Sequence, residues 1–326
     1  MPQDGAAGRT GSRTPVLRTI GLTKRYGAAT VVDNLDLAVR PGEVFGFLGP
    51  NGAGKTTTIA MVLGLIRPTA GRVELFGAPQ SDAALRRVGS LVESPTFYPY
   101  LSGRDNLRAV ARLTPDVPPS GVEAALERVD LTAAAGRPYR TYSLGMKQRL
   151  GIAAALLADP ALVVLDEPTN GLDPAGLVQV RGLIRDLAAQ GHTVFLSSHL
   201  LHEVEQVCDR VAIIRRGVAI AQGSVAELAH DGGRGGFRLL PSDSARAAAV
   251  LTALPWVEHV ARDGDHLAVQ APADRAFALS EALAGAGIYL GELTRREESL
   301  ERFFLALTEE GVAPPAGGPP AGGAQS

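Results

Sequence analysis

A glycine-rich loop carries the residues whose types and spacing best fit a chemical task. Residues 49–57 read GPNGAGKTT, and the pattern G-x-x-x-x-G-K-[ST] is completed by Gly49, Gly54, Lys55 and Thr56. The glycines at 49, 52 and 54 permit backbone angles that other residues avoid, so consecutive N–H groups can turn inward around an anion. A lysine after such a loop reaches the β- and γ-phosphates, and the threonine hydroxyl can bind Mg²⁺. The loop therefore predicts a binding site for the phosphates of a nucleotide.

Two adjacent carboxylates form the second group with a chemical role. Asp166 and Glu167 follow directly after the apolar run 162–165, which reads LVVL. A carboxylate at the end of a buried parallel strand can face a phosphate loop across the sheet. We therefore assign Asp166 to Mg²⁺, through a water molecule, and Glu167 to polarising the attacking water. The alternative interpretation is a solvated strand end that carries two acids.

These groups require a strand before the loop and a helix after it. Residues 44–48 have the length and composition of a buried strand, and residues 57–66 favour a helix. Strands and helices alternate through residue 230, which indicates an α/β fold with a parallel sheet. The other expected strands cover 16–22, 31–39, 72–76, 88–92, 162–165, 193–196, 211–214 and 218–221. The other expected helices cover 104–113, 121–129, 144–158, 176–190 and 200–207.

The chain changes character after the glycine-rich residues 231–236. Residues 237–293 predict the order strand, helix, strand, strand, helix, strand, which matches a small α+β ferredoxin-like module. An amphipathic helix is expected at 299–308, with apolar residues Leu300, Phe303, Phe304 and Leu307. The expected domains are a disordered N-terminus (1–15), a nucleotide-binding domain (16–230) with a helical subdomain at about 94–158, an accessory module (236–309) and a disordered tail (310–326). For the module, regulation, dimer contact and scaffolding stay open.

Composition and charge narrow the partners and the compartment. The chain of 326 residues has a net charge of −2 and no basic stripe, so we expect no nucleic-acid partner. Its single cysteine, Cys208, suits a reducing compartment, and residues 1–15 lack the apolar core of a signal peptide. No apolar run approaches the roughly 20 residues of a membrane span. We therefore expect a cytoplasmic protein whose membrane role comes through a partner.

Several ordered motifs between residues 17 and 228 resemble those of the ATP-binding subunits of ABC transporters. The loop at 49–57 resembles the Walker A motif, LVVLDEP at 162–168 the Walker B strand, and GLD at 171–173 the D-loop. His199 resembles the switch histidine, and Tyr26 the aromatic residue that stacks on adenine. The resemblance implies a P-loop NTPase domain with a helical subdomain, ATP hydrolysis coupled to transport, and ATP and Mg²⁺ as cofactors.

The resemblance also implies a role for each matching residue. Nucleotide contacts are expected from Tyr26, Gly49, Pro50, Asn51, Gly52, Ala53, Gly54, Lys55, Thr56, Thr57, Ser143, Gly145 and Asp173. Metal contacts are expected from Thr56, Asp166 and Glu93. Catalytic roles are expected for Glu167 as the base, His199 as the γ-phosphate sensor, and Glu93.

Two motifs depart from the usual family pattern. The signature, commonly LSGGQ, reads YSLGM at 142–146, which keeps Ser143 and Gly145 but places Leu144 and Met146 where the family has glycine and glutamine. In the family, the retained serine and glycine contact the γ-phosphate of the opposite subunit. Glu93 stands where the family usually has glutamine, and its carboxylate could still meet the metal or the water.

The pairing of VESP at 92–95 with YSLGM resembles the branch that exports bacitracin, lantibiotics and drugs. The resemblance implies a multi-spanning membrane permease that contacts this chain through about Glu93 to Leu101. Phe97, Tyr98 and Tyr100 could anchor that contact, or they could pack inside the helical subdomain. The resemblance further implies a homodimer that sandwiches ATP between two copies, located peripherally on the inner face of the cell membrane.

Other functions remain in competition with the transporter hypothesis. Relatives that act on ribosomes or nucleic acid usually carry two ATPase cassettes or a long coiled-coil insertion, and this chain has one cassette without such an insertion. A P-loop kinase or GTPase would lack the serine–glycine signature and the switch histidine. His199 and His202 have the i, i+3 spacing of a metal pair, but no further clustered Cys or His completes such a site.

Overall fold

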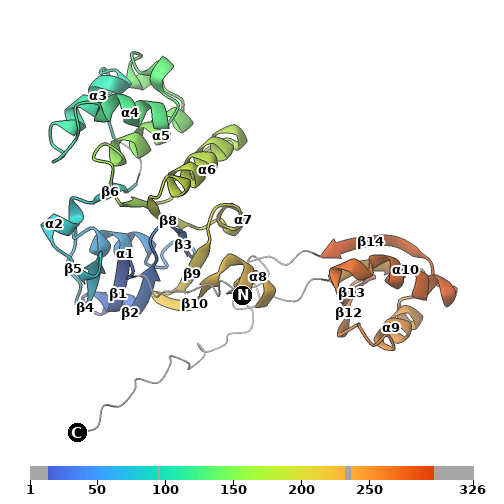
Figure 1. Ribbon diagram of the computed structural model, residues 1–326. Helices are drawn as coiled ribbons and strands as arrows, with labels where there is room; N and C mark the ends of the chain where they lie inside the picture. Colours follow the sequence, from blue (N-terminus) through green and yellow to red (C-terminus); the bar gives the residue numbers. More distant parts are fainter. Residues whose placement is uncertain (1–13, 94–95, 232–235, 297–326) are drawn as a thin grey trace, which may run out of the picture. The chain divides into compact units, whose positions relative to one another are not determined.

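The computed structural model describes residues 14–93, 96–231 and 236–296 of the chain (Figure 1). Contacts divide the chain between Ser224 and Val225 into two compact units, which we call the first unit and the C-terminal module. The expected helix at 299–308, the expected disordered tail at 310–326 and residues 1–13 of the expected disordered N-terminus (1–15) lie outside the described residues. Among the residues described, no helix is long and apolar enough to cross a membrane.

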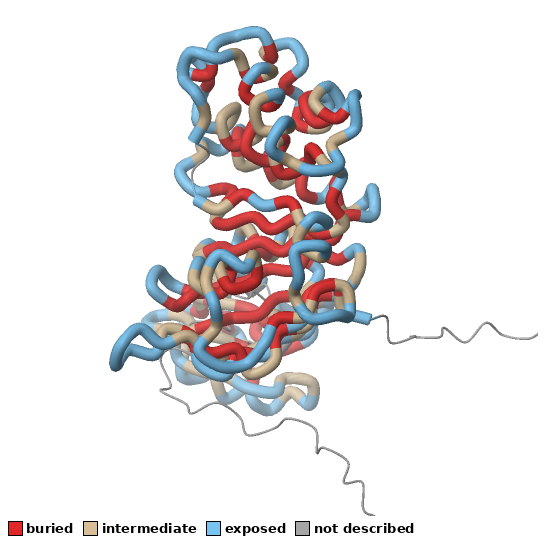
Figure 2. The backbone as a smooth tube through the Cα atoms, turned by 90° about the vertical axis from the view of Figure 1, so that its left-hand side faces the viewer, coloured by how far each residue is buried: buried red, intermediate tan, exposed pale blue. Residues whose placement is uncertain are grey.

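A six-stranded sheet forms the centre of the first unit, in the order β10-β9-β3-β8-β7-β6. Its strands are β3 (Val44–Leu48), β6 (Val88–Leu91), β7 (Leu162–Leu165), β8 (Thr193–Ser198), β9 (Arg210–Arg215) and β10 (Val218–Ser224). Neighbours from β9 to β6 run parallel, and β10 is antiparallel to β9. Every residue of β3, β7 and β8 is buried, as expected for parallel strands covered on both faces (Figure 2). The predicted parallel α/β fold is confirmed.

A second, antiparallel sheet of the first unit was not predicted. It has the order β2-β1-β4-β5 and consists of β1 (Leu17–Tyr26), β2 (Ala29–Val39), β4 (Ala70–Leu75) and β5 (Ala78–Pro79). Its inward residues share one core with β3 and helix α1, including Leu35, Phe47 and Ile59. Tyr26 ends β1 opposite Ala29, and the turn between the two strands consists of the two residues that separate them.

The helices of the first unit flank these sheets. They are α1 (Lys55–Val62), α2 (Asp82–Leu85), α3 (Gly103–Ala111), α4 (Gly121–Arg128), α5 (Leu144–Ala155), α6 (Pro174–Ala189) and α7 (Leu201–Glu205). Figure 1 shows α3, α4 and α5 gathered at one end of this unit, where they contact one another and α5 contacts β6. The chain thus forms the predicted helical subdomain between β6 and β7. Helix α5 ends at Ala155, earlier than the expected residue 158, since the chain turns there toward Pro160.

The C-terminal module begins with α8 (Val225–Asp231) and contains the predicted ferredoxin-like order of elements. These are β11 (Gly236–Pro241), α9 (Ser244–Thr252), β12 (His259–Asp263), β13 (His266–Gln270), α10 (Ala276–Gly285) and β14 (Leu290–Arg296). The sheet order is β12-β13-β11-β14, and every neighbouring pair is antiparallel. Alternate residues of the central strands, such as Phe237 and Val269, face α9 and α10 in a separate core. The predicted module fold is therefore confirmed.

Candidate functional site

The glycine loop joins the end of β3 to the first turn of α1. Gly52 and Gly54 have φ values of 78° and 105°, in the left-handed region that favours glycine. Position 49 requires glycine for a different reason. A Cβ atom there would lie 2.5 Å from the carbonyl oxygen of Ile214 on β9, so close packing excludes a side chain. The expectation that all three glycines supply special backbone angles is therefore wrong for Gly49.

A cavity of about 320 Å³ lies beside this loop. It is lined by Val31, Asn51, Gly52, Gly54, Lys55, Thr56, Thr57, Glu167, Asn170 and His199. The structure thus brings the predicted phosphate loop, the predicted base and the predicted sensor to one place. Val31 and Asn170 were not predicted. Asn170 could have been predicted, because it lies only three residues after Glu167 in the sequence. Val31 could not, because it reaches the cavity only through the passage of β2 beside Gly54.

Lys55 is held by the loop and by an acid from another strand. Its Nζ donates to the carbonyl oxygen of Gly49 at 2.7 Å and lies 3.1 Å from Oε1 of Glu167. The lysine side chain is 6% exposed and the glutamate 21% exposed, so both charges face little water. A bound phosphate would compete with Glu167 for the lysine, because both are oxygen anions in reach of one ammonium group.

Asp166 lies next to Thr56 in a largely buried position. The Thr56 hydroxyl donates to Oδ2 of Asp166 at 2.9 Å, although the two residues are 110 positions apart in the chain. A hydroxyl and a carboxylate are hard oxygen donors, which suit Mg²⁺. In the described part of the chain, no cluster of three His, Cys, Asp or Glu residues could hold a metal alone. The donor set therefore fits a Mg²⁺ ion that takes its other ligands from nucleotide phosphates and water.

Glu167 connects the lysine to His199. Its Oε1 faces Lys55, and its Oε2 lies 2.7 Å from Nδ1 of His199. The backbone of Glu167 has φ 49°, an uncommon value for a residue with a side chain. The carboxylate is thus oriented at both oxygens and remains on the cavity wall, where it can accept a proton from a bound water.

The signature and the D-loop lie outside this cavity. Ser143 caps α5 by accepting from the Met146 amide at 3.3 Å, and Asp173 caps α6 by accepting from the Gly176 amide at 2.8 Å. Ser143 and Leu144 are exposed. Within one chain, the cavity lining therefore does not include the predicted contacts Ser143, Gly145 and Asp173.

Tyr26 and Glu93 are also absent from the cavity lining. Tyr26 is 52% exposed at the end of β1, and Nζ of Lys24 lies 5.0 Å from the centroid of its ring. Glu93 is exposed just after β6, with φ 62°. Among the three aromatics that follow, Phe97 packs edge-on against Tyr139 at 5.3 Å. Tyr98 and Tyr100 are 68% and 80% exposed.

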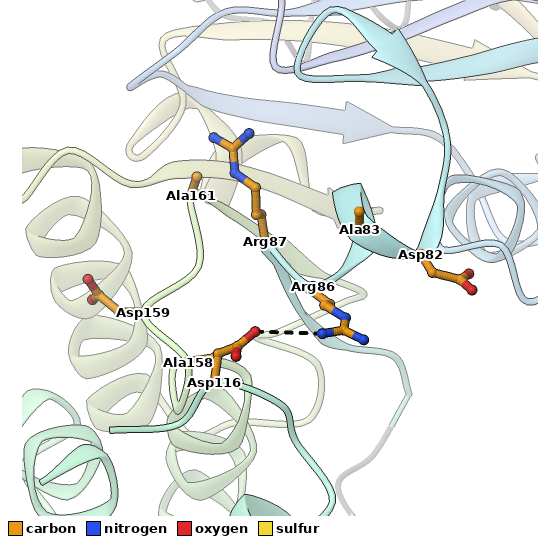
Figure 3. A pocket seen from close by; sticks show the side chains of 8 residues that line it. All are labelled: Asp82, Ala83, Arg86, Arg87, Asp116, Ala158, Asp159 and Ala161. Carbon is orange, nitrogen blue, oxygen red and sulfur yellow. Dashed lines mark ion pairs between the residues drawn. The ribbon is translucent and has the colours of Figure 1, made fainter. Parts of the chain in front are cut away.

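A larger hollow of about 590 Å³ lies beside α2 and the start of β6 (Figure 3). It is lined by Asp82, Ala83, Arg86, Arg87, Asp116, Ala158, Asp159 and Ala161. Arg86 lies 4.0 Å from Asp116, and both side chains are more than half exposed. The Arg87 guanidinium stacks 3.8 Å from the Phe76 ring centroid. This hollow has no glycine among its lining residues, so no glycine-rich phosphate loop faces it.

Comparisons with known proteins agree with the motifs and the fold. The family model described as ABC transporter matches residues 32–170. The bacitracin transport ATP-binding protein BcrA of Enterococcus faecalis is 39% identical over 297 residues, which cover 90% of this chain and 96% of that protein. The daunorubicin resistance ATP-binding protein DrrA3 of Streptomyces coeruleorubidus is 37% identical over 298 residues, covering 88% of this chain and 94% of that protein.

A solved structure described as an ATP-binding subunit of an ABC transporter is also similar to this chain. It is 29% identical with a TM-score of 0.59, and the match covers 66% of this chain and 92% of that one. Both sequence relatives match over nearly their whole length, and so does the chain of the solved structure. The chain therefore belongs to the ATP-binding proteins of ABC transporters, which are ATPases coupled to transport.

Proposed function

We propose that this chain binds and hydrolyses ATP to drive export of an antibiotic peptide or drug-like compound through a separate permease. The convergence of Lys55, Thr56, Glu167 and His199 on one cavity carries the ATPase part of the proposal. The cargo class is supported by two relatives over most of the chain, one named for bacitracin transport and one for daunorubicin resistance.

Within the cavity, the chain's own residues divide the work of phosphate binding and proton transfer. The loop amides and Lys55 hold the phosphates, and Tyr26 stacks on the adenine from its exposed position. Thr56, and Asp166 through a water molecule, would hold Mg²⁺, which when bound would neutralise part of the phosphate charge. Glu167 takes the proton of the attacking water. His199 senses the γ-phosphate, and its 2.7 Å contact also keeps the Glu167 carboxylate oriented.

A second copy of the chain completes the site. Ser143, Gly145 and Asp173 lie outside the cavity of their own chain, and Ser143 is exposed at a helix N-terminus. A helix N-terminus with a free approach suits an anion from another molecule. We propose that these residues face the γ-phosphate bound to a partner copy, so that ATP closes a homodimer and hydrolysis reopens it.

The permease contact is proposed at the segment from Glu93 to Leu101. Tyr98 and Tyr100 are exposed there, whereas Phe97 packs on Tyr139 and supports the segment from within. Exposed aromatics are typical anchors of protein interfaces. This contact would hold the protein peripherally on the inner face of the cell membrane. Glu93 would link the contact to the metal or the attacking water.

The test is affinity purification of tagged Glu167→Gln protein with Mg-ATP from detergent-solubilised cells of its source. We expect a stoichiometric polytopic membrane protein to copurify. The double variant Tyr98→Ala/Tyr100→Ala should lose that partner but keep nucleotide binding. Tyr289→Ala is the matched control, because Tyr289 is 74% exposed in the C-terminal module. Copurification of ribosomes or nucleic acid without a membrane protein would instead support a non-transport function and overturn the proposal.

A further inference from the structure

Ser197 is a polar residue in a fully buried strand. It lies on β8, a strand whose residues are all buried, and its own side chain is 0% exposed. Strands β7 and β8 run parallel with Leu165 beside Leu196. Asp166 directly follows β7, and Ser197 is the residue after Leu196 on β8, so a hydroxyl lies beside the carboxylate.

The Ser197 hydroxyl forms hydrogen bonds with both acidic residues of the site, with the carboxylate of Asp166 and with the backbone amide of Glu167. Its Oγ donates to Oδ1 of Asp166 at 2.5 Å, and the same oxygen accepts from the Glu167 amide at 2.9 Å. A serine hydroxyl can do both, because it has one donor and two acceptor lone pairs. An alanine or a valine at this position could make neither bond.

These two hydrogen bonds have different consequences for the two acids. Asp166 accepts from Thr56 at Oδ2 and from Ser197 at Oδ1, so both oxygens are oriented and the plane of the carboxylate is defined. Glu167 has φ 49°, and the bond from its amide to Ser197 supports that uncommon backbone conformation. The same conformation leaves its carboxylate within reach of Lys55 and His199.

We propose that Ser197 is a positioning residue, which orients Asp166 for Mg²⁺ and holds Glu167 at the cavity wall. The inference rests on the proposed roles of Asp166 and Glu167. It adds that one buried hydroxyl sets the geometry of both, so its loss should affect the Mg²⁺-dependent part of nucleotide binding before it affects the fold. Ser197 does not line the cavity, so it acts through the two acids.

The experiment compares Ser197→Ala with wild type by calorimetric titration of ADP, with and without Mg²⁺, so that no turnover is needed. We expect the gain in ADP affinity on adding Mg²⁺ to fall by about 10-fold or more, as is usual when a partner of a metal-ligating group is removed. Affinity without Mg²⁺ should stay close to wild type. In ATPase assays, the Mg²⁺ concentration for half-maximal rate should rise together with a fall in the maximal rate.

Two variants provide the controls. Ser198→Ala removes a hydroxyl from the next position of the same strand, where Ser198 is 1% exposed and accepts from the Leu200 amide at 3.0 Å. It should leave the Mg²⁺-dependent gain close to the wild-type value. Ser197→Thr keeps a hydroxyl and should restore most of the gain. If Ser197→Ala does not fold, Ser197→Cys, which has a weaker donor, carries the same comparison.

The outcomes separate this inference from the proposed function. A lower melting temperature with an unchanged Mg²⁺-dependent gain would mean that Ser197 only satisfies buried polar groups, and the inference would be overturned. Equal losses with and without Mg²⁺ would also overturn it. If wild-type protein itself shows no Mg²⁺-dependent nucleotide binding, the proposed function fails, independently of Ser197.

Discussion

The cavity beside the glycine loop measures about 320 Å³, and the hollow beside α2 measures about 590 Å³. The smaller cavity nevertheless has the shorter and more deeply buried ion pair. In the cavity, Lys55 and Glu167 form an ion pair with side chains 6% and 21% exposed. In the hollow, the pair of Arg86 and Asp116 is 59% and 77% exposed and longer, at 4.0 Å. Charges that face little water interact strongly, whereas exposed pairs are screened.

The backbone makes a second difference between these two regions. The cavity is lined by glycines of a loop that runs into a helix N-terminus, so amides can face an anion there. The hollow is lined by arginine, aspartate and alanine side chains, and its cations already face an acid or an aromatic ring. Burial of charge and a glycine-rich loop therefore identify the site better than volume does.

The largest effect is expected from Glu167→Gln. The amide cannot accept the proton of the attacking water, so ATP turnover should fall by about 1,000-fold. The same change removes the negative charge beside Lys55, and ATP should therefore bind at least as tightly as in wild type. Single-turnover hydrolysis and equilibrium ATP binding measure the two effects. A variant that turns over ATP like wild type would exclude Glu167 as the base.

Lys55→Ala should reduce turnover by about 100-fold or more, because a preorganised charge on the phosphates is lost. Nucleotide affinity should fall with it, since Glu167 would then face the phosphates without its counterion. Arg86→Ala is the matched removal of a cation from the larger hollow. It should change neither turnover nor nucleotide affinity, and equal losses in both variants would contradict the distinction between the two regions.

Gly49→Ala tests the packing of the loop. The added Cβ would lie 2.5 Å from the Ile214 carbonyl oxygen, which the backbone of β9 cannot easily avoid. We expect a loss of about 1 to 3 kcal/mol in the free energy of unfolding, as for other overpacked sites. Denaturant titration measures the change. Nucleotide binding should also weaken, because the loop must move to relieve the contact.

Gly182→Ala should have the smallest effect, and with the opposite sign. Gly182 lies inside α6, and a Cβ there would meet no atom within 4 Å. Alanine favours the helix over glycine by about 0.5 to 1 kcal/mol. The free energy of unfolding should rise by that amount, with ATPase rates unchanged. Destabilisation by this variant would show that glycine at 182 has a role beyond helix propensity.

Local patterns were enough to predict much of this protein. The phosphate loop follows from glycine spacing with Lys55 and Thr56, because backbone freedom and side-chain chemistry are properties of neighbouring residues. The parallel sheet follows from continuous apolar runs such as β7, and the ferredoxin-like module follows from its order of strands and helices. The sequence by itself therefore determined the fold class, the presence of an ATP site and the family.

Other features depend on contacts between distant segments. The antiparallel sheet was not predicted, because pairing of β1 with β4 brings together strands separated by the whole glycine loop and α1. Gly49 is excluded from carrying a side chain by β9, and Val31 reaches the cavity from β2. Local sequence patterns do not predict which residue of a neighbouring strand lies beside a given position.

The contacts of Asp166 and Glu167 show most clearly what the sequence predicts and what only the tertiary structure decides. The sequence placed Asp166 and Glu167 after a buried strand, but nothing local joins them to Lys55, His199 or Ser197. Only the tertiary structure decided that Glu167 pairs with Lys55 and that the Ser197 hydroxyl contacts both acids. The physical reason is that hydrogen bonds of a few ångströms depend on the register of adjacent parallel strands, and that register is set by packing of the whole sheet.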